Sequence, residues 1–456
     1  MTSADPSIRR AYARDASGLE LVPDTVARPG AAEEVVELLR RATAEHTPVT
    51  VAGGQTSTTG ASITDRGMLL SLRALDHIGS VDADARTVRV QPGVIVGALK
   101  RALAGQGWLF APDPTSEDEA TIGGAIACNA SGARSLRYGP TRPHVVSLRV
   151  ALANGTVIDV RRSRVEKNTV GYALVHDPVD WFVGSEGTLG VVLDAELALL
   201  PMPPRVVGLG FPFAREGDAL EFILAARGSR QVAPRCLELF DAGALALVRE
   251  FQTREARAPW ASGAEAFVYA EESGADDAEP PLDAWLALAE QHAARTDDVL
   301  VFESDAAIRD ARQARHAVPA TMIERGNANR PRGGRRVSTD WAVPYPRLRE
   351  AIAEGRRLAR EAGIEPPVIY GHAGNGHPHQ NFIARDAAEL ERIERVVEAT
   401  LRHVIALGGT VAAEHGVGKL KRRWVPLQLS PVQLGVMRAV KHELDPHGLL
   451  GAGNIF

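Results

Sequence analysis

Cysteine is scarce in this sequence, with only Cys128 and Cys236 among 456 residues. Two thiols cannot form a disulfide framework, and an iron–sulfur cluster needs about four thiolate ligands. Long apolar runs are also missing, because the stretch VVLDAELALL is far shorter than the roughly 20 residues of a transmembrane helix. The first residues, MTSADPSIRR, lack the apolar segment of a signal peptide. We therefore expect a cytoplasmic protein, with peripheral attachment to the inner face of the membrane as an alternative.

Neither sign of charge dominates. The chain has 52 Lys and Arg against 57 Asp and Glu, a net charge of −5, and the two signs are mixed along the sequence. This balance argues against a nucleic-acid partner. No Gly-x-Gly-x-x-Gly fingerprint begins a predicted strand–helix unit, so NAD is not expected as the cofactor. The length predicts two or three domains.

Glycine, in contrast, is abundant, with 43 residues that gather in clusters. The first cluster is GGQTSTTG, which follows a short run of strand-forming residues at 49–51 and a predicted helix that begins near Ala31. Such a loop presents backbone N–H groups and hydroxyls to a phosphate. By itself this stretch is equally consistent with a flexible turn, since it lacks the lysine of a P-loop.

Two further clusters follow. The segment 112–158 contains TIGGAIACNASG and then a predicted β-hairpin with its turn at Asn154-Gly155. The segment from Asp180, DWFVGSEGTLGVVLDAELALLP, places three glycines before a predicted strand. Three glycine-rich loops at strand ends suggest a large phosphate-bearing ligand in an extended groove.

These segments, in this order, resemble the vanillyl-alcohol-oxidase/PCMH family of FAD flavoproteins. The combination of PDP, TIGGxIAxNASG, YGxTRxxV and FVGSEGTLGVV is similar to the branch of D-lactate and D-2-hydroxyglutarate dehydrogenases, which includes the flavin subunit of glycolate oxidase. The resemblance covers nearly the whole chain. It implies an α+β fold, with a two-subdomain PCMH-type FAD-binding domain at 1–203, an α+β substrate (cap) domain at 204–425 that carries a metal site, and a C-terminal segment at 426–456 that packs back on the FAD domain.

The resemblance assigns the glycine clusters and the chain end to FAD. Gln55 stands where the family more often has glycine, and where some relatives attach the flavin covalently through histidine. Glutamine cannot form that bond, so we expect non-covalent FAD. The positions that match the family's FAD contacts are Gly53, Gly54, Gln55, Thr56, Ser57, Pro112, Thr115, Thr121, Gly124, Asn129, Ser131, Gly132, Glu186, Gly187, Thr188, Gly190, Val191 and Asn454.

The stretch YGHAGNGHPH at 370–379 holds three histidines, which on residues alone indicate either a metal site or a surface turn. In the family, the motif GHxGxGxxH gives its first and last histidines, here His372 and His379, to a divalent metal. The motif AAEHGVGK at 412–419 likewise implies Glu414 as the third ligand and His415 as an unligated catalytic base. Two imidazoles and a carboxylate suit zinc, or alternatively iron or manganese, and leave positions open for a substrate.

A substrate carboxylate calls for a cation, and the resemblance points to Arg315. The basic stretch RPRGGRRVSTDWAVP follows. In some relatives a lysine near the start of the corresponding strand binds a second carboxylate. Here the residues are Ser338-Thr339-Asp340, and this departure argues mildly against a dicarboxylate substrate. Arg332, Arg335 and Arg336 are close enough in sequence to take over that role, so this question stays open.

The implied function is oxidation of a D-2-hydroxy acid, with D-lactate or glycolate favoured, to the 2-oxo acid by hydride transfer to flavin N5. The electron acceptor stays open among a quinone, a cytochrome, an electron-transfer flavoprotein and an iron–sulfur subunit. An alternative is a flavin subunit that works inside a glycolate or lactate oxidase complex with an iron–sulfur partner and has little activity alone. A metal-dependent hydrolase is a third alternative, but it leaves the glycine clusters unexplained. A homodimer is compatible with the sequence.

Overall fold

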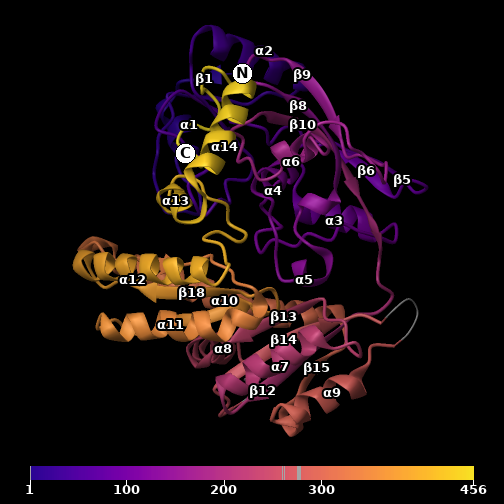
Figure 1. The fold of residues 1–456 in the computed structure, drawn as a ribbon, viewed down its shortest axis with the longest axis vertical. Coiled ribbons are helices and arrows are strands. Elements are labelled where there is room, and N and C mark those ends of the chain that lie inside the picture. The colour runs from indigo at the N-terminus through magenta and orange to yellow at the C-terminus, as the bar shows by residue number, and fades with distance from the viewer. Residues whose placement is uncertain (1, 259, 261, 275–278) are drawn as a thin grey trace. The chain divides into compact units, whose positions relative to one another are not determined.

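The computed structural model describes residues 2–258, 260, 262–274 and 279–456. The chain forms two compact units. The first unit contains Met1–Gly132, Gly139–Met202 and Glu414–Phe456, and the second contains Ala133–Tyr138 and Pro203–Ala413. Figure 1 traces the elements of both along the chain.

The returning C-terminal segment begins earlier than the sequence suggested. The prediction assigned 414–425 to the substrate domain, whereas these residues belong to the first unit. The reason lies in two contacts, since the amides of Val417 and Gly418 donate to the Glu186 carboxylate. The short segment 133–138, predicted as part of the FAD domain, belongs to the second unit.

The first unit is built on two main sheets. One has the order β1-β2-β4-β3, in which the pairs β2–β4 and β3–β4 are parallel. The other is antiparallel, with the order β5-β6-β10-β8-β9. The predicted turn at Asn154-Gly155 joins β8 to β9. The strands of this unit are β1 (Thr2–Ser3), β2 (Thr25–Ala27), β3 (Val49–Ala52), β4 (Met68–Ser71), β5 (Ile78–Asp82), β6 (Thr87–Val90), β7 (Trp108–Leu109), β8 (Val145–Ala151), β9 (Val157–Arg161), β10 (Val191–Ala198) and β11 (Leu200–Pro201).

Helices cover these sheets with the apolar faces that their sequences predict. In α2 the buried residues are Val35, Leu39 and Ala42, at helical spacing, and the first turn carries Glu33 and Glu34, which suit the helix dipole. The helices of the first unit are α1 (Pro6–Ala11), α2 (Ala32–Ala44), α3 (Val96–Ala104), α4 (Ile122–Cys128), α6 (Val179–Phe182), α13 (Val425–Gln428) and α14 (Pro431–Leu444).

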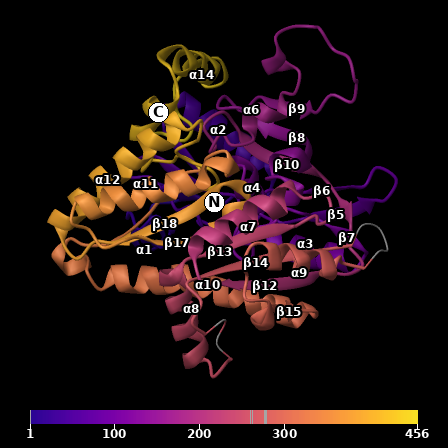
Figure 2. The ribbon, with the colours of Figure 1, turned by 60° about the horizontal axis from the view of Figure 1, so that its bottom comes forward.

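The second unit is a seven-stranded sheet with the order β15-β12-β14-β13-β17-β18-β16, in which every pair of neighbours is antiparallel. Figure 2 shows its strands side by side between helices. The strands are β12 (Val207–Phe213), β13 (Cys236–Phe240), β14 (Ala266–Glu272), β15 (Leu300–Phe302), β16 (Arg336–Ser338), β17 (Val368–His372) and β18 (His377–Ile383). The helices are α5 (Ser135–Tyr138), α7 (Glu216–Gly228), α8 (Ala242–Arg254), α9 (Leu282–Gln291), α10 (Asp305–Asn327), α11 (Leu348–Glu361) and α12 (Ala387–Ala406).

The two faces of this sheet have different partners. On one face, Phe240, Phe267 and Tyr370 pack in a common core with residues of α8 and α10. On the other face, Phe211 lies 4.8 Å from Phe222 of α7 and 5.7 Å from Trp285 of α9, measured between ring centroids. The first of these faces also carries the histidines described below. In the described part of the chain, no helix is both long enough and apolar enough to cross a membrane.

Candidate active site

The first glycine cluster forms a loop after β3 in which two glycines are required by close approach. A Cβ at Gly53 would lie 2.1 Å from Thr121 Oγ1, and one at Gly54 would lie 2.1 Å from the Glu119 carbonyl oxygen. Residues 54–57 are half-buried, and their amides have no hydrogen-bond acceptor among the described residues. Four consecutive amides of this kind suit an anion, so the loop fits the pyrophosphate of FAD.

Gln55 takes the left-handed conformation, with φ of 55°. Its side chain turns to the N-terminal segment, since Nε2 donates to the Tyr12 carbonyl oxygen at 2.9 Å. Ser57 Oγ accepts from the amides of Thr59 and Ala61, both at 3.2 Å. The side chains of this loop therefore hold its shape, and its backbone is left to face a ligand.

The second cluster contains α4 and the turn that follows it. Thr121 caps the helix by accepting the Gly124 amide, and the amides of Ile122 and Gly123 donate to Val94 and Pro92 carbonyl oxygens. The amides of the first turn of this helix thus donate to acceptors within the protein. Asn129 ends the helix in the left-handed conformation, with φ of 51°.

The third cluster is tied to the C-terminal segment through Glu186. Its buried carboxylate accepts the amides of Val417 and Gly418 at 2.5 and 2.7 Å. Asn454, also buried, donates to the carbonyl oxygens of Ala61 and Glu186, and it accepts from Lys419 Nζ at 2.8 Å. Burial is the main cause that lowers the pKa of Lys419 to about 8.

The predicted base lies in the same unit as these loops. His415 Nε2 is 3.3 Å from Glu414 Oε1, and Ser131 Oγ donates to the other oxygen of Glu414, also at 3.3 Å. Thr59 donates to the His415 carbonyl oxygen. The segment 414–419 is thus held against the first and second glycine clusters.

In the second unit, strand register brings the three histidines together. In the hairpin of β17 and β18, His372 pairs with His377, and Tyr370 pairs with His379. Because directly paired residues of antiparallel strands point to the same face, all three imidazoles lie on one face. They are buried, with ring centroids 4.8 to 5.4 Å apart. Ring nitrogens of His372 and His379 lie within 4.8 Å of each other.

Glu238 of β13 orients His372. Its Oε1 lies 2.6 Å from His372 Nδ1, and its Oε2 accepts from Arg315 Nε at 2.9 Å. Burial raises the pKa of Glu238, but His372 and Arg315 outweigh that effect and hold the pKa at about 2. A carboxylate on Nδ1 fixes the tautomer that leaves Nε2 available as a metal ligand. These residues therefore fit a divalent metal.

Arg315 lies on α10 and is 8% exposed. The sequence predicted that it binds the substrate carboxylate. In the structure its guanidinium pairs with Glu238, and its Nη2 lies 3.4 Å from His372 Nε2. Arg315 thus lies beside the predicted metal ligand His372, and its guanidinium is paired with the Glu238 carboxylate.

Two acidic residues near the histidines were missed by sequence reasoning. Glu238 is one, and Asp340, whose Oδ1 lies 3.1 Å from His377 Nε2, is the other. A signal for Glu238 was available, because CLELF is an apolar strand in which a carboxylate at an inward position needs a partner. His377, the middle histidine of YGHAGNGHPH, is a buried residue of β18.

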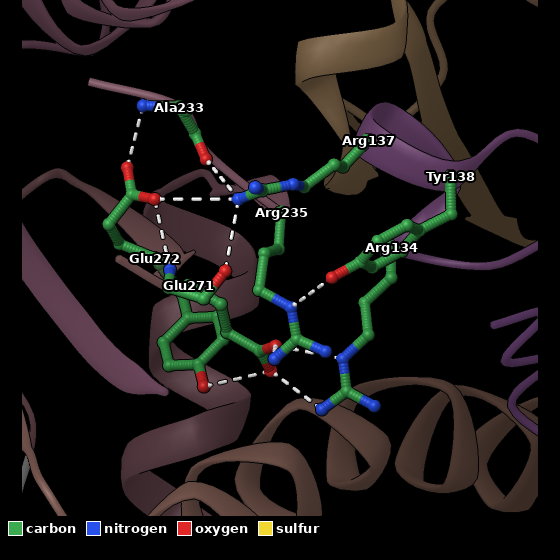
Figure 3. A network of polar contacts seen from close by, with 9 residues as sticks. Arg134, Arg137, Tyr138, Ala233, Arg235, Glu271 and Glu272 are labelled. Atoms are coloured by element: carbon green, nitrogen blue, oxygen red, sulfur yellow. Dashed lines mark hydrogen bonds and ion pairs between the residues drawn. The ribbon is translucent and has the colours of Figure 1, made fainter. Parts of the chain in front are cut away.

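A second polar network lies at β14 of the same sheet (Figure 3). Arg134 donates to both oxygens of the buried Glu271, and Arg235 Nη1 donates to its Oε2 at 3.3 Å. Arg235 Nε also donates to the Tyr138 hydroxyl at 3.0 Å. These bonds attach the segment 133–138 to the second unit.

Comparison with known proteins decides the family. Residues 23–161 match the FAD binding domain, and residues 202–455 match the C-terminal domain of FAD linked oxidases. The chain belongs to the FAD-linked oxidases. The predicted family and fold class are thereby confirmed, and the enzyme is an oxidoreductase that uses FAD.

Relatives of this oxidase share almost its whole length. It is 29% identical to glycolate oxidase subunit GlcD of Bacillus subtilis, over 98% of this chain and 92% of the relative. It is 31% identical to D-lactate dehydrogenase of Archaeoglobus fulgidus, over 94% and 90% of the two chains. It is 30% identical to D-2-hydroxyglutarate dehydrogenase of Xanthomonas citri, over 95% and 89%.

Among solved structures, an alkyldihydroxyacetonephosphate synthase matches with a TM-score of 0.72 and 18% identity. The match covers 99% of this chain and 81% of the synthase. At this level of identity the likeness concerns the fold.

Proposed function

We propose that this FAD-linked oxidase oxidises a D-2-hydroxy acid to the 2-oxo acid with the help of a divalent metal. The observation that carries the proposal is the pair of buried imidazoles of His372 and His379, one of which is oriented by Glu238. The names of the relatives support the substrate class, since they include glycolate, D-lactate and D-2-hydroxyglutarate enzymes.

Glu414 is proposed as the third ligand. The chain itself supports this role. The amide of Ala413 donates to the Asp340 carbonyl oxygen at 2.8 Å, and Glu414 is joined to Ala413 by the next peptide bond. Two histidines and one carboxylate suit zinc, or alternatively iron or manganese. When bound, such a metal supplies a Lewis acid for the hydroxyl and carboxylate of the substrate.

His415 is proposed as the general base that takes the hydroxyl proton. Its ring lies beside the Glu414 carboxylate, which stabilises the imidazolium that forms. Arg315 donates to Glu238 and contacts His372, which supports a role in positioning that ligand, and we propose that it also binds the substrate carboxylate. FAD, when bound, accepts the two electrons that the substrate loses.

The test is anaerobic reduction of the purified flavoprotein, followed as loss of the visible absorption of oxidised flavin. D-lactate, L-lactate, glycolate, D-malate and D-2-hydroxyglutarate are added separately, before and after chelation and after metal is restored. We expect a D-hydroxy acid to bleach the flavin, chelation to stop the bleaching, and metal to restore it. Bleaching that is fully insensitive to chelation would refute the metal dependence.

Variants assign the roles within the same experiment. Glu414→Gln and His379→Ala should lose metal while they retain FAD. His415→Asn should retain both the metal and FAD. Its flavin should be reduced about 10²- to 10⁴-fold more slowly, because the variant lacks the base. Full metal occupancy in Glu414→Gln would remove Glu414 from the ligand set.

A second candidate is a flavin subunit that passes electrons to an iron–sulfur partner. It is favoured by the cysteine count, since Cys128 and Cys236 cannot hold a cluster, and by the subunit name of one relative. Turnover of the purified chain with an artificial acceptor separates the two candidates, because an accessory subunit shows little activity alone.

A further inference from the structure

His377 of β18 and Asp340, which follows β16, form a buried pair that the proposed reaction does not use. Their side chains are 4% and 2% exposed, respectively. His377 Nε2 lies 3.1 Å from Asp340 Oδ1, yet this nitrogen has no hydrogen-bond partner among the described residues. The imidazole nitrogen and the carboxylate oxygen are therefore close to each other without the alignment that a shared proton needs.

The geometry of this pair matches that of two ligands of one metal ion. Zinc binds imidazole nitrogen and carboxylate oxygen at about 2.0–2.2 Å. Two donor atoms at about 2.1 Å from one ion are about 3.0 Å apart at a right angle and about 3.4 Å apart at the tetrahedral angle. The separation of 3.1 Å between His377 and Asp340 lies between these values. Two ligands of one ion point at the ion and not at each other, so their contact is short without being a hydrogen bond.

The backbone on both sides of Asp340 is fixed. The amide of Thr339 donates to the Gln380 carbonyl oxygen of β18 at 3.0 Å, and the Asp340 carbonyl oxygen accepts the amide of Ala413 at 2.8 Å. The position of the Asp340 carboxylate is thus set by the strand that carries His377. A metal site needs ligands that are held in place in this way by the surrounding structure.

The pair adjoins the proposed ligands of the first metal ion. His377 is the direct cross-strand partner of His372. Its ring centroid is 5.4 Å from that of His372 and 4.8 Å from that of His379. The ions of two-metal sites lie about 3.5–4 Å apart. Imidazoles at these separations can therefore bind different ions of such a pair.

The charges of the cluster also favour a second cation. Arg315 and Glu238 compensate each other in an ion pair at 2.9 Å. Asp340 adds a further buried carboxylate, and a buried carboxylate is costly unless a cation accompanies it. A divalent cation at Asp340 and His377 provides that compensation, and imidazole with carboxylate is a ligand set that suits zinc, manganese or iron.

We propose that His377 and Asp340 bind a second divalent metal ion beside the ion of His372 and His379. The inference rests on the proposed function, because it extends the metal centre of that site from one ion to two. It also gives a role to the middle histidine of YGHAGNGHPH, which the proposed reaction leaves without one.

Two carboxylates are suited to contact both ions. Glu414 directly follows Ala413, whose amide bonds to Asp340, and a carboxylate has two oxygens that can each bind an ion. The substrate is the other, since a 2-hydroxy acid offers its hydroxyl and two carboxylate oxygens. Two ions hold such a molecule in one orientation, which is the template role of a two-metal site.

The test counts metal ions per FAD. Metal is removed while FAD is retained, Mn²⁺ is added in excess, and free ion is removed before metal and flavin are measured. We expect about two ions per FAD in the wild type and about one in His377→Asn and in Asp340→Asn. His442→Asn is the matched control, because His442 is exposed on α14 and should leave the count unchanged. Electron paramagnetic resonance should show magnetic coupling between two Mn²⁺ ions in the wild type and none in His377→Asn or Asp340→Asn.

One ion per FAD or fewer in the wild type would overturn the proposal, whether or not His377→Asn loses that ion. About two ions in the wild type and the same count in both variants would overturn the assignment to His377 and Asp340. The wild-type count and its spectrum need no substitution, so the proposal can fail even if a variant does not fold.

Flavin reduction separates this inference from the proposed function. If the wild type binds two coupled ions and no hydroxy acid bleaches the flavin, the reaction is wrong and the second ion stands. If bleaching depends on metal and the wild type binds a single ion, the reaction stands and the second ion is refuted.

Discussion

At the scale of single residues, Glu238 decides how His372 is presented. Its carboxylate contacts His372 Nδ1 on one oxygen and Arg315 on the other, and it is 1% exposed. A histidine whose Nδ1–H is held in this way cannot rotate its ring freely, and its Nε2 keeps a lone pair for a metal. The quality of the proposed metal site therefore depends on a residue that does not touch the metal.

Glu238→Gln tests this dependence. Glutamine keeps the shape of the side chain and loses the charge, so we expect metal affinity to fall about 10- to 100-fold while FAD content stays the same. The metal is removed from the protein while FAD is retained, and metal is then titrated back. Calorimetry records the binding. Glu250→Gln is the matched control, because Glu250 pairs with Arg325 at the surface. An affinity equal to wild type in Glu238→Gln would show that the contact is structural only.

The residues also show what the sequence could predict. His372 and His379 were found because their spacing belongs to a motif, and the strand register explains how that spacing places them together. Glu238 was missed because it lies 134 residues from His372 and only the sheet brings them together. Arg332, Arg335 and Arg336 were equivalent in the sequence, whereas in the structure Arg335 pairs with Glu394 and Arg332 donates to Asn329.

At the scale of elements, the segment 133–138 illustrates how a local contact overrides chain order. The sequence placed it among the FAD-binding residues that precede it. Arg134 instead donates to both carboxylate oxygens of Glu271 on β14. The Tyr138 hydroxyl accepts a hydrogen bond from Arg235, the residue before β13 (Figure 3). Turn signals predicted the β8–β9 hairpin correctly, because such a turn depends on neighbours in sequence. They gave no information on a segment that is held by partners about 100 residues away.

Glu271 should make the second unit sensitive to acid. Burial raises the pKa of Glu271, but Arg134 and Arg235 outweigh it and hold the pKa at about 2, below the ordinary 4.5. A lowered pKa in the folded state means that the unfolded state binds more protons in this window. The stabilisation, about 3 kcal/mol, is therefore complete above pH 4.5 and is lost as pH falls toward 2.

Glu271→Gln removes this dependence. At neutral pH it should destabilise the second unit by about 3–5 kcal/mol, because two arginines lose their carboxylate. Between pH 4.5 and 2 its free energy of unfolding should fall less steeply than that of the wild type. Urea unfolding at several pH values measures both effects, with Glu250→Gln as the control. Parallel slopes for the variant and the wild type would contradict the assignment.

At the scale of the whole molecule, the chain contains two units with separate cores. The first carries the glycine loops and the segment 414–456, and the second carries the seven-stranded sheet. A cofactor that binds one folded unit stabilises that unit by mass action. Trp285 and Trp341 are fully buried in the second unit, so they report on that unit in a protein whose first-unit tryptophans, Trp108, Trp181 and Trp424, are replaced by phenylalanine.

We expect the midpoint temperatures of flavin release and of tryptophan exposure to respond to different substitutions and ligands. Free FAD at about 100 times its Kd should stabilise the first unit by about 2.7 kcal/mol and raise the temperature at which flavin fluorescence is released. Glu271→Gln should lower the midpoint of tryptophan exposure more than that of flavin release, because its partners all lie in the second unit. Gly54→Val should do the opposite, since its side chain would collide with the Glu119 carbonyl oxygen. If both midpoints shift together by the same amount in all three cases, the units unfold as one cooperative body, and the separate cores do not act as separate units of stability.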